Sequence, residues 1–284
     1  MSSLKYKKIY IDTRYKTPDS VSTSHFKVNL PETLSFEGNT CFYIDDFTCG
    51  HSWTSIEDFN NKLYLYISQN DNPDNKYAFV IAIANGNYTG ADFAIELQNK
   101  IRTTTALIQP NMFNVFYNTK NNSLTISITF SGYKFRVLTP DDLKTALTGK
   151  FYATYNKSRT NDINEVLSNL EGSDIQYDYN TPFVSGFLNF QPINNIYLHS
   201  NSLGNFNSIS CDGSQTVIKK IPVNVDYGIM IHDQCVLFND YNDCSHQSIK
   251  MLEFQLKTAR GDLIPLHGVN VNFSILFTRA SQDV

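Results

Sequence analysis

Residues 251–277 read MLEFQLKTARGDLIPLHGVNVNFSILF and contain the two clearest strand patterns of the chain. Over the second half, the apolar residues Val271, Phe273 and Ile275 alternate with polar residues, and residues 252–257 show the same alternation. A period of two places one set of side chains on a buried face and the other set on an exposed face. The stretch therefore predicts two half-buried strands joined by a tight turn at Gly261.

Strand signals also dominate the rest of the 284-residue chain. It has 31 Asn residues, and its aromatic residues are 20 Phe and 17 Tyr against one Trp. Asn favours turns, whereas Phe and Tyr favour strands. Further strands are predicted at His25–Leu30, Cys41–Phe47, Lys62–Ser68, Tyr77–Ile83, Phe113–Tyr117, Leu124–Thr129, Tyr133–Leu138, Asn195–His199, Thr216–Pro222 and Gly228–His232. Many short strands separated by turns indicate a mainly β protein, an antiparallel β-sandwich or a barrel.

Helix signals gather in the middle of the chain. A capping box at Thr89–Asp92 precedes an apolar periodic segment, Thr139–Asp142 offers a second helix start that can end at Gly149, and Asp162 can open a third helix ending near Gly172. We expect this region to be inserted between sandwich strands. The expected division is a basic N-terminal arm at 1–20, a first set of strands at 21–85, a helix-bearing insertion at 86–182 and a second set of strands at 183–284.

The N-terminus is basic although the whole chain carries a net charge of -4. The first sixteen residues contain one acidic residue, Asp12, and five basic ones: Lys5, Lys7, Lys8, Arg14 and Lys16. A basic arm on an acidic body can contact an anionic partner, either DNA or an acidic protein surface. Two alternatives are a solvated, frayed terminus and a strand over Ile9–Lys16 that is added to a sheet edge.

No motif in the sequence predicts catalysis, a cofactor or a metal site. The chain has no P-loop, no nucleophile elbow and no paired His on a helix. The densest set of possible zinc ligands, Cys235, Cys244 and His246, has no recognised spacing and flanks a predicted hairpin turn. Asp45 and Asp46 are adjacent within a predicted strand, so we expect their carboxylates to point to opposite faces and not to share a proton. The prediction is a protein that is not an enzyme.

The cysteines and the apolar segments constrain the environment. Five Cys without a C-x-x-C pair, in a chain whose first residues contain no apolar signal segment, predict reduced thiols inside a cell. The longest apolar run, Tyr77–Ala84, is too short to span a bilayer. Arg260-Gly261-Asp262 spells an adhesion tripeptide, but a glycine flanked by charges is also what a hairpin tip requires.

A series of short segments resembles one known family, the minor capsid (penton) proteins of virophages and polinton (Maverick) elements. The segments are Ile9–Lys16, Phe42–Asp46 leading to His51-Ser52-Trp53, Gly86-Asn87-Tyr88, Asn195–Ser200 and Leu263–Gly268. The resemblance implies a single jelly roll with a helix-containing insertion. It also implies a structural capsid protein, five copies of which form the vertex capsomer of an icosahedral virion assembled inside the host cell. The implied partners are copies of the same chain and a double-jelly-roll major capsid protein. In such a particle, we expect the basic arm to reach either an adjacent capsomer or packaged DNA.

Two other functions remain open at this point. One is a receptor- or carbohydrate-binding sandwich of a virion surface, with the aromatic residues of the inserted loops forming a sugar platform: Phe151, Tyr152, Tyr155, Tyr177 and Tyr179. The other is an enzyme on a β-sandwich, which would need titratable groups that converge in a cleft.

Overall fold

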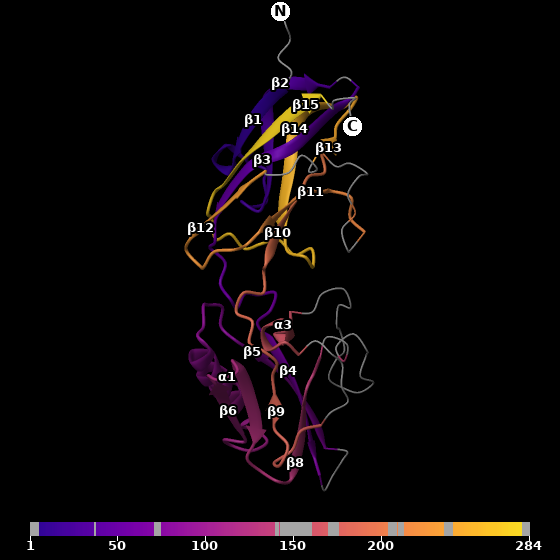
Figure 1. The fold of residues 1–284 in the computed structure, drawn as a ribbon. Helices are drawn as coiled ribbons and strands as arrows, with labels where there is room; N and C mark the ends of the chain where they lie inside the picture. Colours follow the sequence, from indigo (N-terminus) through magenta and orange to yellow (C-terminus); the bar gives the residue numbers. More distant parts are fainter. Residues whose placement is uncertain are drawn as a thin grey trace, which may run out of the picture. The chain divides into compact units, whose positions relative to one another are not determined.

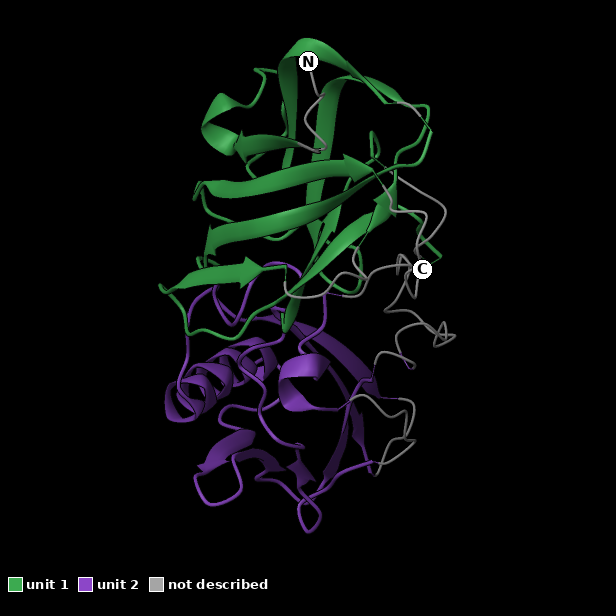
Figure 2. Cartoon of the chain, turned by 45° about the horizontal axis from the view of Figure 1, so that its top comes forward, with its two compact units in different colours: residues 1–53, 193–284 green, residues 54–192 purple. Residues whose placement is uncertain are grey.

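The computed structural model divides into two compact units (Figure 2). Unit 1 contains residues 1–53 and 193–284, and unit 2 contains residues 54–192. The structure describes residues 6–36, 38–70, 75–139, 142, 161–169, 176–203, 209, 213–235 and 241–279. Each unit has its own sheets and its own buried side chains.

Unit 1 contains two antiparallel sheets (Figure 1). Sheet A has the strand order β1-β15-β3-β12, with the short β13 also paired to β3, and sheet B has the order β11-β10-β14-β2. The strands are β1 (Tyr6–Asp12), β2 (His25–Ser35), β3 (Thr40–Gly50), β10 (Asn195–His199), β11 (Val217–Pro222), β12 (Met230–Gln234), β13 (Asn242–Asp243), β14 (Ser248–Lys257) and β15 (Val271–Arg279).

The strand pairs of unit 1 are nested. Leaving out the two-residue β13, the first strand pairs with the last (β1 with β15), the second with the next to last (β2 with β14), the third with β12, and β10 with β11. Such nesting is one long antiparallel hairpin folded over so that successive pairs lie alternately in two sheets. This is the jelly-roll topology of eight strands. The prediction of a mainly β sandwich with a single jelly roll is therefore confirmed.

Four phenylalanines bring the inner faces of the two sheets together. Phe26 and Phe254 come from sheet B, Phe47 and Phe273 from sheet A, and all four side chains are fully or almost fully buried. The Phe254 and Phe273 ring centroids are 4.9 Å apart in an edge-to-face arrangement, and Phe47 stacks on Phe273 at 6.2 Å. Phe26, Phe254 and Phe273 belong to the alternating apolar positions of the predicted strands, whereas Phe47 ends the mostly apolar run Cys41–Phe47.

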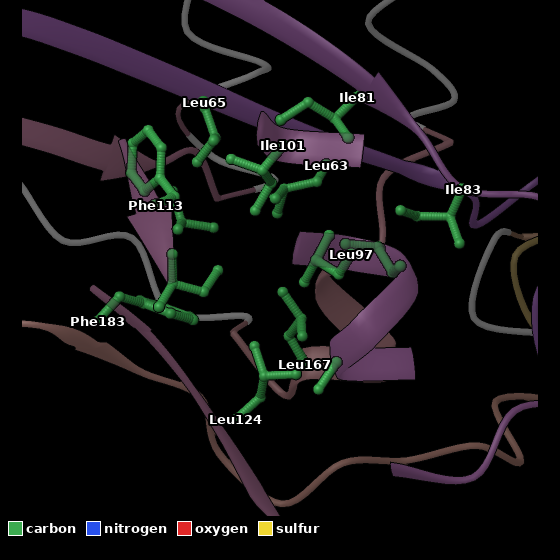
Figure 3. Close-up of a cluster of buried hydrophobic side chains, with 14 of the residues drawn as sticks. Leu63, Leu65, Ile81, Ile83, Leu97, Ile101, Phe113, Leu124, Leu167 and Phe183 are labelled. Carbon is green, nitrogen blue, oxygen red and sulfur yellow. The ribbon is translucent and has the colours of Figure 1, made fainter. Parts of the chain in front are cut away.

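Unit 2 surrounds a second core. One sheet has the order β5-β4-β8, another has the order β6-β7-β9, and the helix α1 contacts β5 and β6. Figure 3 shows how side chains from strands of both sheets and from α1 converge, among them Leu65, Leu97 and Phe113. The elements are β4 (Lys62–Gln69), β5 (Lys76–Ala82), α1 (Gly90–Thr105), β6 (Phe113–Asn118), β7 (Ser123–Ile128), β8 (Tyr133–Val137), α3 (Asn164–Leu167) and β9 (Phe183–Val184).

The three helix predictions have different outcomes. The α1 helix begins as predicted, because the Thr89 hydroxyl accepts the Asp92 amide and donates to the Asp92 carboxylate. Thr139 and Asp142 form the same reciprocal contacts, but most of the helix predicted to follow lies outside the described residues. The third helix does not continue to Gly172. It ends at Leu167 because Ser168 adopts a left-handed backbone with φ of 47°.

The inserted unit is longer than the segment 86–182 expected from sequence. It starts at Thr54 and ends at Pro192, so that β4 and β5 belong to unit 2 and not to the jelly roll. The pattern of Leu63, Leu65 and Ile67 correctly predicts a strand with one buried face, but such a pattern does not say which core buries it. In the described residues, no helix has the length and hydropathy of a membrane-spanning segment.

We predict that Phe273→Ala destabilises unit 1 by about 3–5 kcal/mol, because it removes the ring that contacts both sheets and leaves a cavity. Urea denaturation followed by fluorescence of Trp53 measures this, since the only Trp of the chain is buried in unit 1. Leu276→Ala is the matched control, on the same strand but half-buried on the opposite face. Equal losses for the two variants would contradict this account of the core.

Candidate functional site

Sheet A ends in two open edges, β1 on one side and β12 on the other. β1 pairs with β15 from Tyr6↔Thr278 to Asp12↔Asn272. Residues 6–12 of the predicted arm therefore form an edge strand, which agrees with the alternative of a strand over Ile9–Lys16 only as far as Asp12. A short 3-10 helix, η1 (Thr13–Tyr15), follows directly, and the Thr13 hydroxyl accepts the Val271 amide at 2.9 Å.

Two of the basic side chains attach β1 to neighbouring strands. The Lys8 Nζ lies 2.5 Å from Asp45 Oδ2 and 3.6 Å from Asp46 Oδ2, both on β3. The hydrogen bond to Asp45 is the main cause that raises the pKa of Lys8. Lys7 forms an ion pair with Glu32 of β2. These contacts favour β1 in its place at the edge of sheet A.

The position of the two aspartates corrects an expectation from sequence. A β-bulge interrupts the pairing of β3 with β15, because Ser274 pairs with Asp46 whereas Ile275 pairs with Ile44. Asp45 is the extra residue, and the bulge lets both carboxylates lie near one ammonium group instead of pointing to opposite faces. The Ser274 hydroxyl also donates to the Asp46 carboxylate. This is a structural ion-pair cluster in which the two acids share a lysine.

The remaining basic residues of the predicted contact set have different surroundings. The Arg14 Nε donates to Asp12 Oδ2 at 2.9 Å, and this contact is the main cause that lowers the pKa of Asp12. The Lys16 side chain is exposed and forms no ion pair with any described residue. Lys5 lies outside the described residues. Near the C-terminal end of β1, Lys16 is therefore the cation that remains available to a partner.

The opposite edge presents a group of apolar side chains that the sequence analysis did not single out. Three large apolar side chains within the four residues 227–230 are each more than half exposed. They are Tyr227 (54%), Ile229 (55%) and Met230 (53%). The sequence predicts a strand over Gly228–His232, and β12 begins at Met230; within the predicted range only Ile231 is buried. A short apolar run in the sequence shows no alternation, so periodicity could not indicate which of these side chains are exposed.

The loop that carries these side chains is held by a buried aromatic pair. The His51 ring lies against Trp53, with centroids 4.3 Å apart, and His51 Nδ1 is 2.9 Å from the Val225 carbonyl oxygen. The His51 amide donates to the Ile229 carbonyl at 2.9 Å, and the Gly228 amide donates to the His51 carbonyl at 2.8 Å. Gly228 has φ of 82°, a conformation that a side chain would disfavour.

Two of the described thiols, those of Cys49 and Cys244, are poorly suited to chemistry. Cys49 and Cys244 are fully buried, and burial raises the pKa of each thiol to about 12. Cys244 Sγ donates to the Thr40 carbonyl at 3.5 Å, which makes it part of the contact between β3 and the chain just after β13. Within the parts of the chain that the structure describes, no group of three or more His, Cys, Asp or Glu side chains is placed to hold a metal ion.

The comparisons with known proteins find a similarity in structure. No protein-family model and no curated protein sequence matches the chain. The structure, however, is similar to the crystal structure of the mavirus penton protein, with a TM-score of 0.50 and 11% sequence identity, over 98% of this chain and 100% of that chain. The chain has the fold of the mavirus penton protein. The resemblance found in the short sequence segments is thereby confirmed at the level of the fold.

Other candidate features have structural explanations in the fold. The Arg260-Gly261-Asp262 stretch forms a turn in which the Thr258 hydroxyl accepts the amides of Arg260 and Asp262. Of the proposed aromatic platform, Tyr177 packs against Phe135 and Phe183 with centroids 5.5 and 5.3 Å away, so its ring is not free to stack on a sugar. Tyr179 is exposed, and Phe151, Tyr152 and Tyr155 lie outside the described residues.

We predict that Lys8→Met lowers the free energy of unfolding of unit 1 by about 1 kcal/mol or less, the usual range for a partly exposed ion pair. Because the pKa of Lys8 is raised above its ordinary 10.5, the stabilisation is complete at neutral pH and is lost as pH rises through the raised pKa. Urea denaturation at several pH values measures it, with Lys16→Met as the matched control. A loss no larger than that of the control would contradict the structural role of Lys8.

Proposed function

We propose that the chain is a structural capsid protein, five copies of which form the vertex capsomer (penton) of an icosahedral virion. The observation that carries this proposal is the full-length similarity to the mavirus penton protein, which includes both the jelly roll and the inserted unit. The two proteins share a fold but only 11% sequence identity. The physical properties of unit 1 therefore provide further support for the capsid proposal.

Unit 1 has the properties that a ring subunit needs. A ring of identical copies requires two different patches on each copy, one that meets the next subunit and one that meets the previous subunit. Sheet A is stiffened by a buried aromatic layer and ends in two chemically different edges. Its role in this proposal is mechanical: the protein acts through the shape of its surface and not through reactive groups.

The proposed partners are further copies of the chain, a double-jelly-roll major capsid protein beside the vertex, and packaged DNA near the N-terminus. The five basic residues Lys5, Lys7, Lys8, Arg14 and Lys16 remain the proposed anionic contacts. Because Lys7, Lys8 and Arg14 have acidic partners within the chain, Lys16 is the strongest candidate for an external contact among the described members of this set. A phosphate contact would weaken as salt concentration rises.

A second function, binding of a receptor or carbohydrate, is favoured by one surface of unit 2. Phe116 on β6, Thr125 on β7 and Val184 on β9 pair across the sheet in one row, and Phe116 and Val184 are 65% and 54% exposed. An exposed ring beside hydroxyl groups suits the apolar face of a sugar. A glycan array probed with Phe116→Ser beside the natural chain tests this, and both functions can belong to one protein.

The capsid proposal is tested by labelling the chain in reconstituted particles. The chain carrying an affinity label after residue 284 is co-expressed with a double-jelly-roll major capsid protein, and purified particles are examined by electron microscopy. We expect the label at the fivefold vertices only. Label spread over all capsomers, or closed particles of normal composition that exclude the chain, would contradict the proposal.

A further inference from the structure

We propose that the C-terminal end of β1 in one copy docks against the loop before β12 in the next copy, and that this contact closes the ring. The first surface, the Tyr15 patch, consists of Arg14, Tyr15 and Lys16. The second surface, the Ile229 patch, consists of Asp226, Tyr227, Ile229 and Met230. The inference rests on the proposed ring-forming function and specifies the two faces that meet.

The two patches lie at opposite edges of one sheet and at the same level along its strands. Asp12 of β1 pairs with Asn272, Asn272 with Thr48, and Thr48 with His232 of β12, which makes one continuous row across sheet A. The Tyr15 patch follows Asp12 directly, and the Ile229 patch directly precedes the same row on β12. A rotation axis parallel to the strands brings patches at equal height together, as a closed ring requires.

Both patches expose apolar groups: the Ile229 patch has three, and the Tyr15 patch has one aromatic ring between two cations. Tyr15 is 77% exposed, and the three apolar side chains of the Ile229 patch are each more than half exposed. Exposed apolar groups that are concentrated in a few consecutive residues indicate a contact surface more strongly than scattered ones. Tyr and Met are also residue types that are enriched in protein interfaces.

The charges of the two patches are complementary. Lys16 follows Tyr15, and Asp226 precedes Tyr227; among the described residues neither of these two charged groups has an ion-pair partner. The loop and strand over residues 223–235 contain two carboxylates and no Lys or Arg. Contact between the patches would pair these charges at the rim of an apolar centre, the arrangement common in specific interfaces.

The Ile229 patch is also rigid before any partner arrives. Its backbone is hydrogen-bonded to His51, and the His51 ring contacts both Trp53 and Tyr227. A surface held in one conformation loses little conformational entropy on binding. This gives the His51-Ser52-Trp53 segment a role: it positions the Ile229 patch from beneath.

Mixing two ring-deficient variants tests the proposal. The first variant, Tyr15→Asp with Lys16→Asp, disables only the Tyr15 patch. The second, Tyr227→Ser with Ile229→Ser and Met230→Ser, disables only the Ile229 patch. Each retains one intact patch, so we expect each alone to sediment as a monomer and an equimolar mixture to form a two-chain species that cannot close. Leu107→Asp, an exposed apolar position in unit 2, is the control that should leave rings unchanged.

The remaining outcomes separate this inference from the proposed function. If the natural chain forms rings but either variant does too, or the mixture stays monomeric, the interface lies elsewhere and the inference is overturned while the proposed function stands. If the natural chain itself forms no ring, both fail. If a variant loses the native Trp53 fluorescence, the single variants Lys16→Glu and Asp226→Lys are used instead. Each variant alone should weaken ring formation, because like charges then face each other. Their mixture should restore the contact, because opposite charges face each other again.

Discussion

The pairing of the first strand with the last is the constraint on which the rest of unit 1 depends. β1 and β15 are joined over seven residue pairs, although they lie more than 250 residues apart in sequence. This pairing places both ends of the jelly roll in one sheet, with β15 between β1 and β3. Lys8, held by Asp45 and Asp46, fixes β1 to a strand that it does not pair with, so the edge is secured through side chains as well as the backbone.

Because the strand pairs are nested, the chain between β3 and β10 can be extended without breaking any of them. Unit 2 occupies this place: the chain leaves the jelly roll after Trp53 and returns at Ile193. Unit 2 can therefore carry its own core and its own exposed row around Phe116 while the two edges of sheet A keep their form. In the functions proposed above, unit 1 therefore supplies the ring contacts and unit 2 the exposed row around Phe116.

Most of the strands could be predicted from sequence, but their partners could not. The alternation around Phe273 and Phe254 is a local property, and it correctly predicts buried faces. Strand order depends on contacts between distant segments, so the placement of β4 and β5 in unit 2 has no local signal. The bulge at Asp45 escaped prediction for the same reason, because it exists only relative to β15. The Ile229 patch was missed because exposed and buried apolar residues look alike in a short segment.

The central claim is that this chain acts as a stiff building block whose two edges fit one another in a closed ring. Native mass spectrometry of the purified natural chain, over a range of concentrations and with the major capsid protein added, is the most direct measurement. The account predicts a discrete five-chain species with no larger open series. A chain that stays monomeric under all these conditions, or that associates only into dimers, would contradict it.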